Sequence, residues 1–176
     1  NSIYNLIEVD LSEFDASEVT TMGYIFSVSQ NLKNIKFGNL NTSSLIEMTG
    51  MFYGCNSLSS IDLSHFNTSK VEKMDYLFSG CSSLTSLDLK KFETSNVITM
   101  EYMFAGCSSL TSLDITTFNT SQVQNMDSLL SGLDSLKGID LSNLDLSKVT
   151  RLSYFFGESK SLTSLHINLE APKVES

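Results

Sequence analysis

Carboxylates placed at a fixed spacing are the side chains of this sequence with the clearest potential for chemistry. Five aspartates share one column of a 26-residue period: Asp10, Asp62, Asp88, Asp114 and Asp140. Lys36 and His166 interrupt that column. On adjacent strands, such carboxylates would lie about 5 Å apart and repel one another. The row could attract a cation, a basic peptide or sugar hydroxyls, or it could be only the solvated side of the strands.

The same columns give little support for a metal site or a catalytic centre. A calcium ion takes about six to eight oxygen ligands, and Asp88 and Asp114 with the serines beside them supply too few. The two histidines, His65 and His166, fall in distant repeats, so no trio of serine, carboxylate and histidine is implied. We therefore expect no enzyme activity, no metal and no cofactor.

Three cysteines form another column. Cys55, Cys81 and Cys107 cannot all pair with one another, and a disulfide requires Cα atoms within about 7 Å. Leu133 takes the same position in the next repeat, which favours a small buried apolar group over a disulfide. Zinc is disfavoured because no histidine or second cysteine lies close in any repeat.

These columns follow from an internal repeat that fills the chain. Seven leucines stand 26 residues apart without insertion or deletion: Leu6, Leu32, Leu58, Leu84, Leu110, Leu136 and Leu162. Apolar residues follow each leucine at the same offsets, so the unit is a structural repeat rather than a bias of composition. We expect residues 1–176 to form one solenoid domain.

The first half of each repeat predicts a short strand. Leu84, Leu87 and Leu89 alternate with polar residues, so that Leu87 and Leu89 face the core while Ser86 and Asp88 face solvent. Successive strands must be parallel, because each is reached through a crossover.

The second half predicts a short helix. Val97, Met100, Met103 and Phe104 form an apolar stripe at helical spacing. A serine column precedes the stripe as a candidate N-cap: Ser17, Ser43, Ser69, Ser95, Ser121 and Ser147. Glu72 and Gln124 would complete capping boxes with Ser69 and Ser121. A glycine column follows the stripe as a candidate C-cap: Gly54, Gly80, Gly106 and Gly132.

These elements predict an α/β leucine-rich repeat solenoid. Strands pack about 4.8 Å apart whereas helices need 8–10 Å, so the array should curve, with strands on the concave face and helices on the convex face. The candidate ligand-binding residues on the concave face are Ser60, Asp62, His65, Ser86, Asp88, Lys90, Lys91, Ser112, Asp114 and Asp140.

Tyrosines recur on the opposite side of the predicted helix from the apolar stripe. The column contains Tyr24, Tyr76, Tyr102 and Tyr154. Tyrosine is favoured at interfaces, so this column is a candidate second contact surface. Alternatively, the rings lie along neighbouring helices and cover apolar side chains.

Composition excludes several classes of partner. The net charge of −9, with only 11 basic residues and no basic run, argues against nucleic acid. No apolar run approaches the roughly 18 residues of a membrane span, and the start does not look like a signal peptide. Obvious capping repeats are lacking, so we expect a segment of a longer protein.

The sequence also resembles the BspA-like leucine-rich repeats of bacterial surface proteins and lipoproteins. The resemblance is carried by the stretch from Met74 to Leu89 and by three copies of one motif: Phe66-Asn-Thr-Ser-Lys-Val, Phe92-Glu-Thr-Ser-Asn-Val and Phe118-Asn-Thr-Ser-Gln-Val. It covers about residues 6–167. Val28 and Glu158 depart from the glycine column, and Lys36 departs from the aspartate column, which puts uniform binding along the array in doubt.

The resemblance implies a secreted or surface-attached protein that adheres to a host protein or glycan, and it carries no catalytic residues. We expect a binding module, most simply a monomer. The alternative is a rigid spacer that displays a neighbouring domain.

Overall fold

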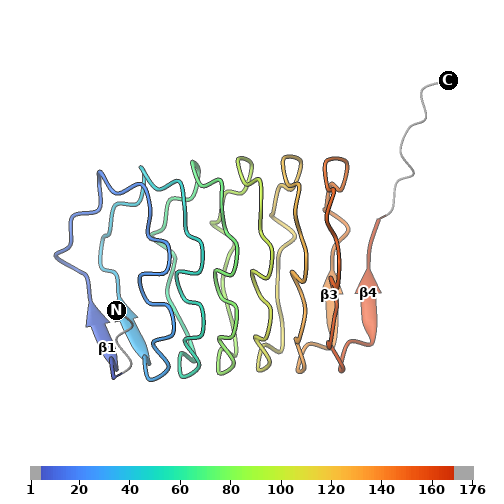
Figure 1. Cartoon of the computed structure of the whole chain (residues 1–176), viewed down its shortest axis with the longest axis horizontal. Coiled ribbons are helices and arrows are strands. Elements are labelled where there is room, and N and C mark those ends of the chain that lie inside the picture. The colour runs from blue at the N-terminus through green and yellow to red at the C-terminus, as the bar shows by residue number, and fades with distance from the viewer. Residues whose placement is uncertain (1–4, 169–176) are drawn as a thin grey trace.

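The computed structural model describes residues 5–168 as a stack of coils lying side by side (Figure 1). The strands are β1 (Glu8–Asp10), β2 (Asn34–Lys36), β3 (Gly138–Asp140) and β4 (Ser164–His166). β1 pairs with β2 and β3 pairs with β4, both in parallel. The strand positions and the parallel order were predicted. However, within the described residues only these four of the seven expected strands form. We call the surface made by these strands and by residues 60–62, 86–88 and 112–114 the strand face.

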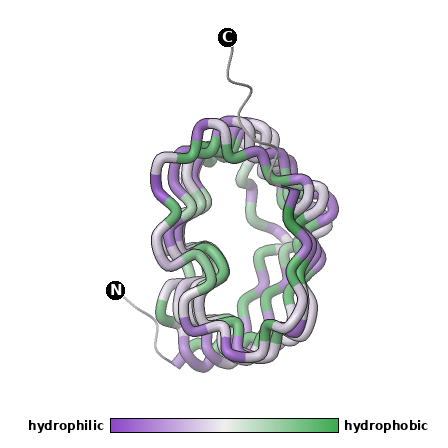
Figure 2. The backbone as a smooth tube through the Cα atoms, turned by 90° about the vertical axis from the view of Figure 1, so that its right-hand side faces the viewer, coloured by the Kyte–Doolittle hydropathy of each residue, from purple (hydrophilic) through white to green (hydrophobic). Residues whose placement is uncertain are grey.

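A second parallel ladder runs about half a coil further along the chain. Single bridges join residues 26 apart, from Thr21 through Glu47, Lys73, Thr99 and Asn125 to Arg151. One coil therefore spans 26 residues. We call the surface formed by this ladder and the turns that follow it the turn face. Figure 2 shows the coils superposed around a common interior, which core side chains fill.

The predicted helices are wrong: residues 5–168 contain no helix. Each expected helix is a run of turns in which two residues have positive φ, for example Tyr102 at 54° and Gly106 at 72°. An α-helix cannot accommodate left-handed residues four positions apart. Alternate N–H groups instead donate to the next coil, as Tyr102 does to Asp127 O at 2.8 Å. The groups between them close turns within the coil, as Met103 does to Met100 O.

The helix-cap assignments are wrong for the same reason. Ser69 does not cap a helix; its N–H donates to Asn67 Oδ1 at 3.0 Å in a turn. Glu72 forms no capping box, and its N–H donates to Ile46 O of the preceding coil. The glycine column has the predicted left-handed φ, from 67° to 75°, but it lies within the turns and not at a helix end.

The curvature was predicted from the wider spacing of helices, and this reason no longer applies because no layer of helices separates the described coils on one side. The turn side of each coil instead meets its neighbours through a continuous ladder of main-chain bridges, and the strand side pairs at β1–β2 and β3–β4. The coils form a nearly straight row (Figures 1 and 2). The strand face is therefore not distinguished as a concave surface, and the turn face is not a convex layer of helices.

The core is built from columns of identical or similar side chains. Phe26, Phe52, Phe78 and Phe104 stack at ring-centroid distances of 5.9, 5.6 and 5.9 Å, with interplanar angles of 9–11°. Parallel stacking at this separation follows from placing the same residue once per coil. The apolar periodicity predicted this core correctly, although not the backbone that carries it.

The cysteine column is buried and free of disulfides. Each thiol donates to the carbonyl of a stacked phenylalanine, as Cys81 does to Phe52 O at 3.1 Å. Burial raises the pKa of the Cys55 and Cys107 thiols to about 12, so these groups stay protonated. They pack as small buried groups, as predicted.

A buried threonine column joins the coils at one corner. Thr94 Oγ1 donates to Asn119 O at 3.0 Å and accepts from Asn119 N–H at 2.8 Å. The same pair of bonds is made by Thr42, Thr68 and Thr120 with the following coil. Each hydroxyl thus satisfies both main-chain groups of a residue in the next coil, which fixes the register of the stack.

Candidate functional site

A shallow groove lies along the C-terminal half of the strand face. It encloses about 630 Å³. Six of the ten predicted binding residues line it: Ser86, Asp88, Lys90, Ser112, Asp114 and Asp140. Gly138, Ser164 and His166 also contribute. The alternation of the strands turns these polar side chains outward while Leu89 and Ile115 are buried beneath.

The aspartates of this groove also have a structural role. Asp88 Oδ1 accepts the N–H of Lys90 at 3.1 Å, and Asp114 Oδ1 accepts both the N–H and the hydroxyl of Thr116. These bonds close Asx turns that end the strand segments. They lower the pKa of Asp114, chiefly through the Thr116 hydroxyl. Both carboxylates are therefore held in place at the surface by one oxygen, which leaves the second oxygen to meet a partner.

The other four predicted residues lie outside this groove. Asp62 and Lys91 line a smaller hollow beside it together with Leu63 and Phe92. Lys91 Nζ donates to Ser64 O at 3.3 Å. Ser60 and His65 are exposed on the strand side of the third coil. The structure thus brings six candidates together and leaves four at the margin.

Within residues 5–168, ion pairs to the aspartate column form at its two ends, whereas Lys91 and His65 near Asp62, and Lys90 near Asp114, act from a greater distance. Lys36 Nζ lies 3.5 Å from Glu8 Oε1 and 3.8 Å from Asp10 Oδ2. His166 Nδ1 lies 3.2 Å from Asp140 Oδ1. Hydrogen bonds from Ser142 are the main cause of the lowered pKa of Asp140, and His166 adds to the effect. Lys36 and His166, which make these contacts, are the two residues that interrupt the aspartate column in the sequence.

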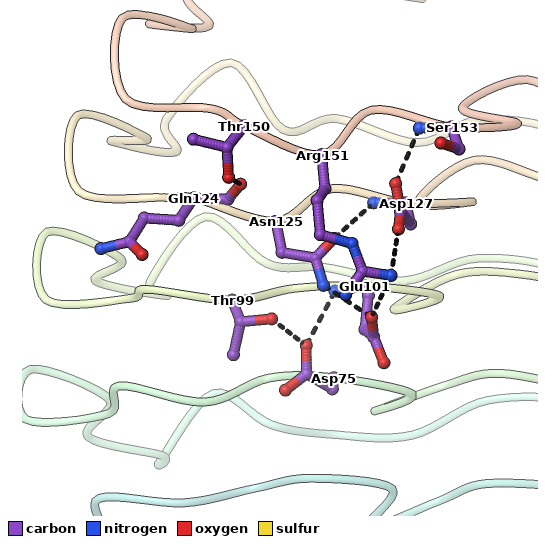
Figure 3. Close-up of polar contacts among 9 residues, drawn as sticks. All are labelled: Asp75, Thr99, Glu101, Gln124, Asn125, Asp127, Thr150, Arg151 and Ser153. Atoms are coloured by element: carbon purple, nitrogen blue, oxygen red, sulfur yellow. Dashed lines mark hydrogen bonds and ion pairs between the residues drawn. The ribbon is translucent and has the colours of Figure 1, made fainter.

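A polar network on the turn face was not predicted (Figure 3). Its acidic members are Asp75, Glu101 and Asp127, one per coil. Asn125 Nδ2 donates to Glu101 Oε2 at 2.6 Å, and Arg151 contacts Asp127 at 2.5 Å and Glu101 at 3.8 Å. Arg151 therefore ties three successive coils together. The sequence signal that could have revealed this network is a column of acids at a 26-residue spacing, each next to a buried methionine.

Asp75 is the partly buried acid at the other end of this network. Its Oδ1 accepts the Thr99 hydroxyl at 2.5 Å and the Glu101 N–H at 2.9 Å. Burial is the main influence on its carboxyl group and raises its pKa above 3.8. Burial and the neighbouring Glu101 raise the pKa of Tyr76 to about 12. The carboxylates of this network already have partners within the protein, so we assign it to coil cohesion.

The tyrosine column lies on the surface, as predicted, although not on helices. Tyr76 and Tyr102 stack at 4.9 Å with an interplanar angle of 5°. Tyr24 lies over Gly50, where a side chain would collide with its ring, because a Cβ there would stand 2.3 Å from a ring carbon. Tyr154 is the most exposed of the four, at 80%. Tyr76 and Tyr102 therefore cover each other's stacked faces, whereas Tyr154 remains open to solvent.

Among the described residues, no group of three His, Cys, Asp or Glu side chains is arranged to hold a metal ion. The same part of the chain contains no helix that could span a membrane.

A family model described as "Mycoplasma protein of unknown function, DUF285" matches residues 2–110 and 80–175, which is nearly the whole chain. None of the curated proteins is significantly similar in sequence.

Two solved bacterial structures are similar in fold. A leucine-rich repeat protein from Bacteroides ovatus has 22% identity and a TM-score of 0.50 over 94% of this chain and 46% of its own. Another from Eubacterium ventriosum has 19% identity and a TM-score of 0.41 over 96% of this chain and 45% of its own. The chain thus spans less than half the length of either protein. The first similarity supports a leucine-rich repeat solenoid.

Proposed function

Because the chain belongs to the family described as "Mycoplasma protein of unknown function, DUF285" and has the solenoid fold of a leucine-rich repeat protein, we propose that it is a binding module. Its strand face would hold a protein or glycan ligand outside the cell, without catalysis. The proposal rests on one observation above all: six predicted side chains of three successive coils line one groove, together with Ser164 and His166 of a fourth coil.

The groove has properties that suit recognition. Its polar side chains are anchored by turns, so little conformational entropy is lost when a ligand orders them. It offers carboxylates, hydroxyls and one ammonium group along a regular spacing, and solenoids commonly bind along such extended surfaces. The net charge of −9 disfavours nucleic acid as the ligand.

The resemblance to BspA-like surface proteins supports an extracellular location and an adhesive role. The Phe-Asn-Thr-Ser-x-Val motif that carries it has a structural function, because the asparagine closes a turn and the threonine joins two coils. The resemblance therefore concerns the scaffold, and the ligand depends on the outward positions of the strand face.

The test is a screen of the purified chain against matrix proteins and glycans. Any ligand found is then measured against a variant with Asp62→Asn, Asp88→Asn and Asp114→Asn. The amide oxygen can still accept the turn hydrogen bond, so the variant should fold while losing the charges. We expect binding to fall; unchanged binding would remove the strand face as the binding surface.

The alternative is a rigid spacer that displays a neighbouring domain. The cohesive columns of phenylalanine and threonine favour stiffness. A chain that binds nothing in the screen but keeps its length under force would support the spacer.

A further inference from the structure

The ladder of the strand face is interrupted in the middle of the molecule. β1 pairs with β2 and β3 with β4, but residues 60–62, 86–88 and 112–114 form no strand pair. Directly before two of these segments, one main-chain bond joins neighbouring coils, from Thr85 N–H to Ser59 O at 3.2 Å. The ladder of the turn face continues across the same coils, so the interruption is local to the strand face.

The interruption leaves main-chain groups unpaired in the groove. The N–H and C=O groups of residues 86–88 and 112–114 have no hydrogen-bond partner within the described part of the chain. Main-chain polar groups need partners, so water or a ligand must satisfy these. The groove therefore holds unused donors and acceptors in addition to its side chains.

The pairing of the strands follows the ion pairs of the aspartate column. The ladder closes at the two positions where a carboxylate contacts a basic side chain, Asp10 with Lys36 and Asp140 with His166. It stays open at the steps without such a contact, between Lys36 and Asp62 and along the aspartates that follow. Like charges at the spacing of adjacent strands repel. Among the described residues no ion pair reaches Asp62, Asp88 or Asp114, although, beyond the turn hydrogen bonds, His65 and Lys91 lower the pKa of Asp62, and Lys90 that of Asp114, from a greater distance. Carboxylates without an ion pair thus coincide with the open ladder.

The chain itself shows how such carboxylates are compensated. Lys36, His166 and Arg151 each reach a carboxylate of the preceding coil, and Arg151 reaches two coils. In each case one cationic side chain lies against acids spaced by the coil repeat. No described cationic side chain forms such an ion pair with the central carboxylates of the strand face.

We infer that the open central part of the strand face binds a basic polypeptide segment, whose lysine or arginine side chains lie between Asp88, Asp114 and the neighbouring carboxylates. Its main chain would hydrogen-bond the unpaired groups of residues 86–88 and 112–114. This inference rests on the proposed function and names the class of its ligand. Charge complementarity selects a basic peptide over an uncharged glycan.

The test titrates the 176-residue chain with a synthetic decapeptide in which lysine and serine alternate, and with a copy in which glutamine replaces lysine. The decisive variant is Asp88→Asn with Asp114→Asn. Its matched control is Asp15→Asn with Asp145→Asn, since these aspartates accept the same turn hydrogen bonds, from Ser17 and Ser147, and their loss changes the net charge equally. Chitohexaose serves as the uncharged saccharide probe.

We expect the lysine peptide to bind and the glutamine peptide not to bind. Two exposed ion pairs contribute up to about 1 kcal/mol each, so the groove variant should weaken binding about tenfold while the control variant changes it little. Hydrogen exchange at residues 86–88 and 112–114 should slow on binding. A general attraction to an acidic protein would weaken both variants equally and leave exchange unchanged, which would overturn the inference.

Saccharide binding separates this inference from the proposed function. If chitohexaose binds and the groove variant abolishes that binding, while the lysine peptide does not bind, the strand face remains a binding surface and the basic partner is wrong. If none of the probes and none of the ligands in the screen binds, both this inference and the proposed binding function are contradicted.

Discussion

Threonine is the residue on which cohesion between coils depends most directly. Thr94→Val keeps the size and shape of the side chain but removes both hydrogen bonds to Asn119. The N–H and C=O of Asn119 would then lack their threonine partner, which costs about 1–3 kcal/mol. Chemical denaturation should show a loss of this size. Thr117→Val, at an exposed position, is the control; an equal loss in both variants would contradict a joining role for the hydroxyl.

The partly buried carboxylate of Asp75 on the turn face gives a prediction with a definite pH dependence. Burial raises the pKa of Asp75 above its ordinary value of 3.8. The folded state therefore binds a proton more tightly than the unfolded state, and Asp75 lowers stability as pH rises through the interval between the two pKa values. The loss is complete once the pH stands above both pKa values.

Asp75→Asn should therefore raise the unfolding temperature at neutral pH. The amide oxygen can still accept the bonds from Thr99 and Glu101. The advantage over the wild type should disappear in acid, where Asp75 is protonated. A variant less stable than wild type at neutral pH would mean that the charge on Asp75 stabilises the network.

The residue types and their spacing were enough to identify some of these positions from the sequence, but not others. The aspartates were recognised because they break an apolar pattern at a regular spacing, and the cysteines because leucine replaces them in one repeat. The threonines were not recognised, because turn chemistry already explained the Asn-Thr-Ser triplet. Their second role depends on a residue 25 positions away, which local sequence reasoning does not examine.

At the scale of elements, four of the seven expected strands form within the described residues, and the predicted helices are wrong. Spacing of three and four is typical of a helix, but a chain of turns with inward residues at Val97, Met100, Met103 and Phe104 produces the same pattern. The backbone differs because Tyr102 adopts a left-handed φ of 54°. Tyrosine gives no warning of such a conformation, and the inter-coil bonds that stabilise it are visible only in the stack.

The open ladder is an element whose state should depend on charge. If repulsion keeps the central coils apart, Asp88→Asn with Asp114→Asn should allow residues 86–88 and 112–114 to pair without any ligand. Amide hydrogen exchange in these segments should then slow relative to wild type, while exchange in β1 and β2 stays the same. Unchanged exchange would show that packing, and not charge, separates the strands.

At the scale of the whole molecule, the coils differ mainly in how completely their neighbours cover them. Met126 is fully buried, whereas Leu152 in the same column is 44% exposed in the last described coil. In a stack where each repeat contacts only its neighbours, the outer coils are the least stable. The groove extends from the well-covered coil of Ser86 towards this less covered region.

The regular spacing of the stack lets a single column act as a surface. The same repetition that fixes the phenylalanine and threonine columns places Asp88, Asp114 and Asp140 in one line. Sequence reasoning found this line because periodicity specifies which residues share a face. It did not find the groove, because the interruption of the ladder depends on contacts between side chains of different coils.

The central claim is that the strand face of the middle coils binds the ligand. Its most direct test is residue-resolved NMR of the isotope-labelled chain, titrated with the ligand from the screen. The account predicts that amide shifts change at residues 86–90 and 112–116 and remain unchanged at Tyr76, Tyr102 and Tyr154. Changes confined to those tyrosines and the turn face, with the groove unaffected, would contradict it.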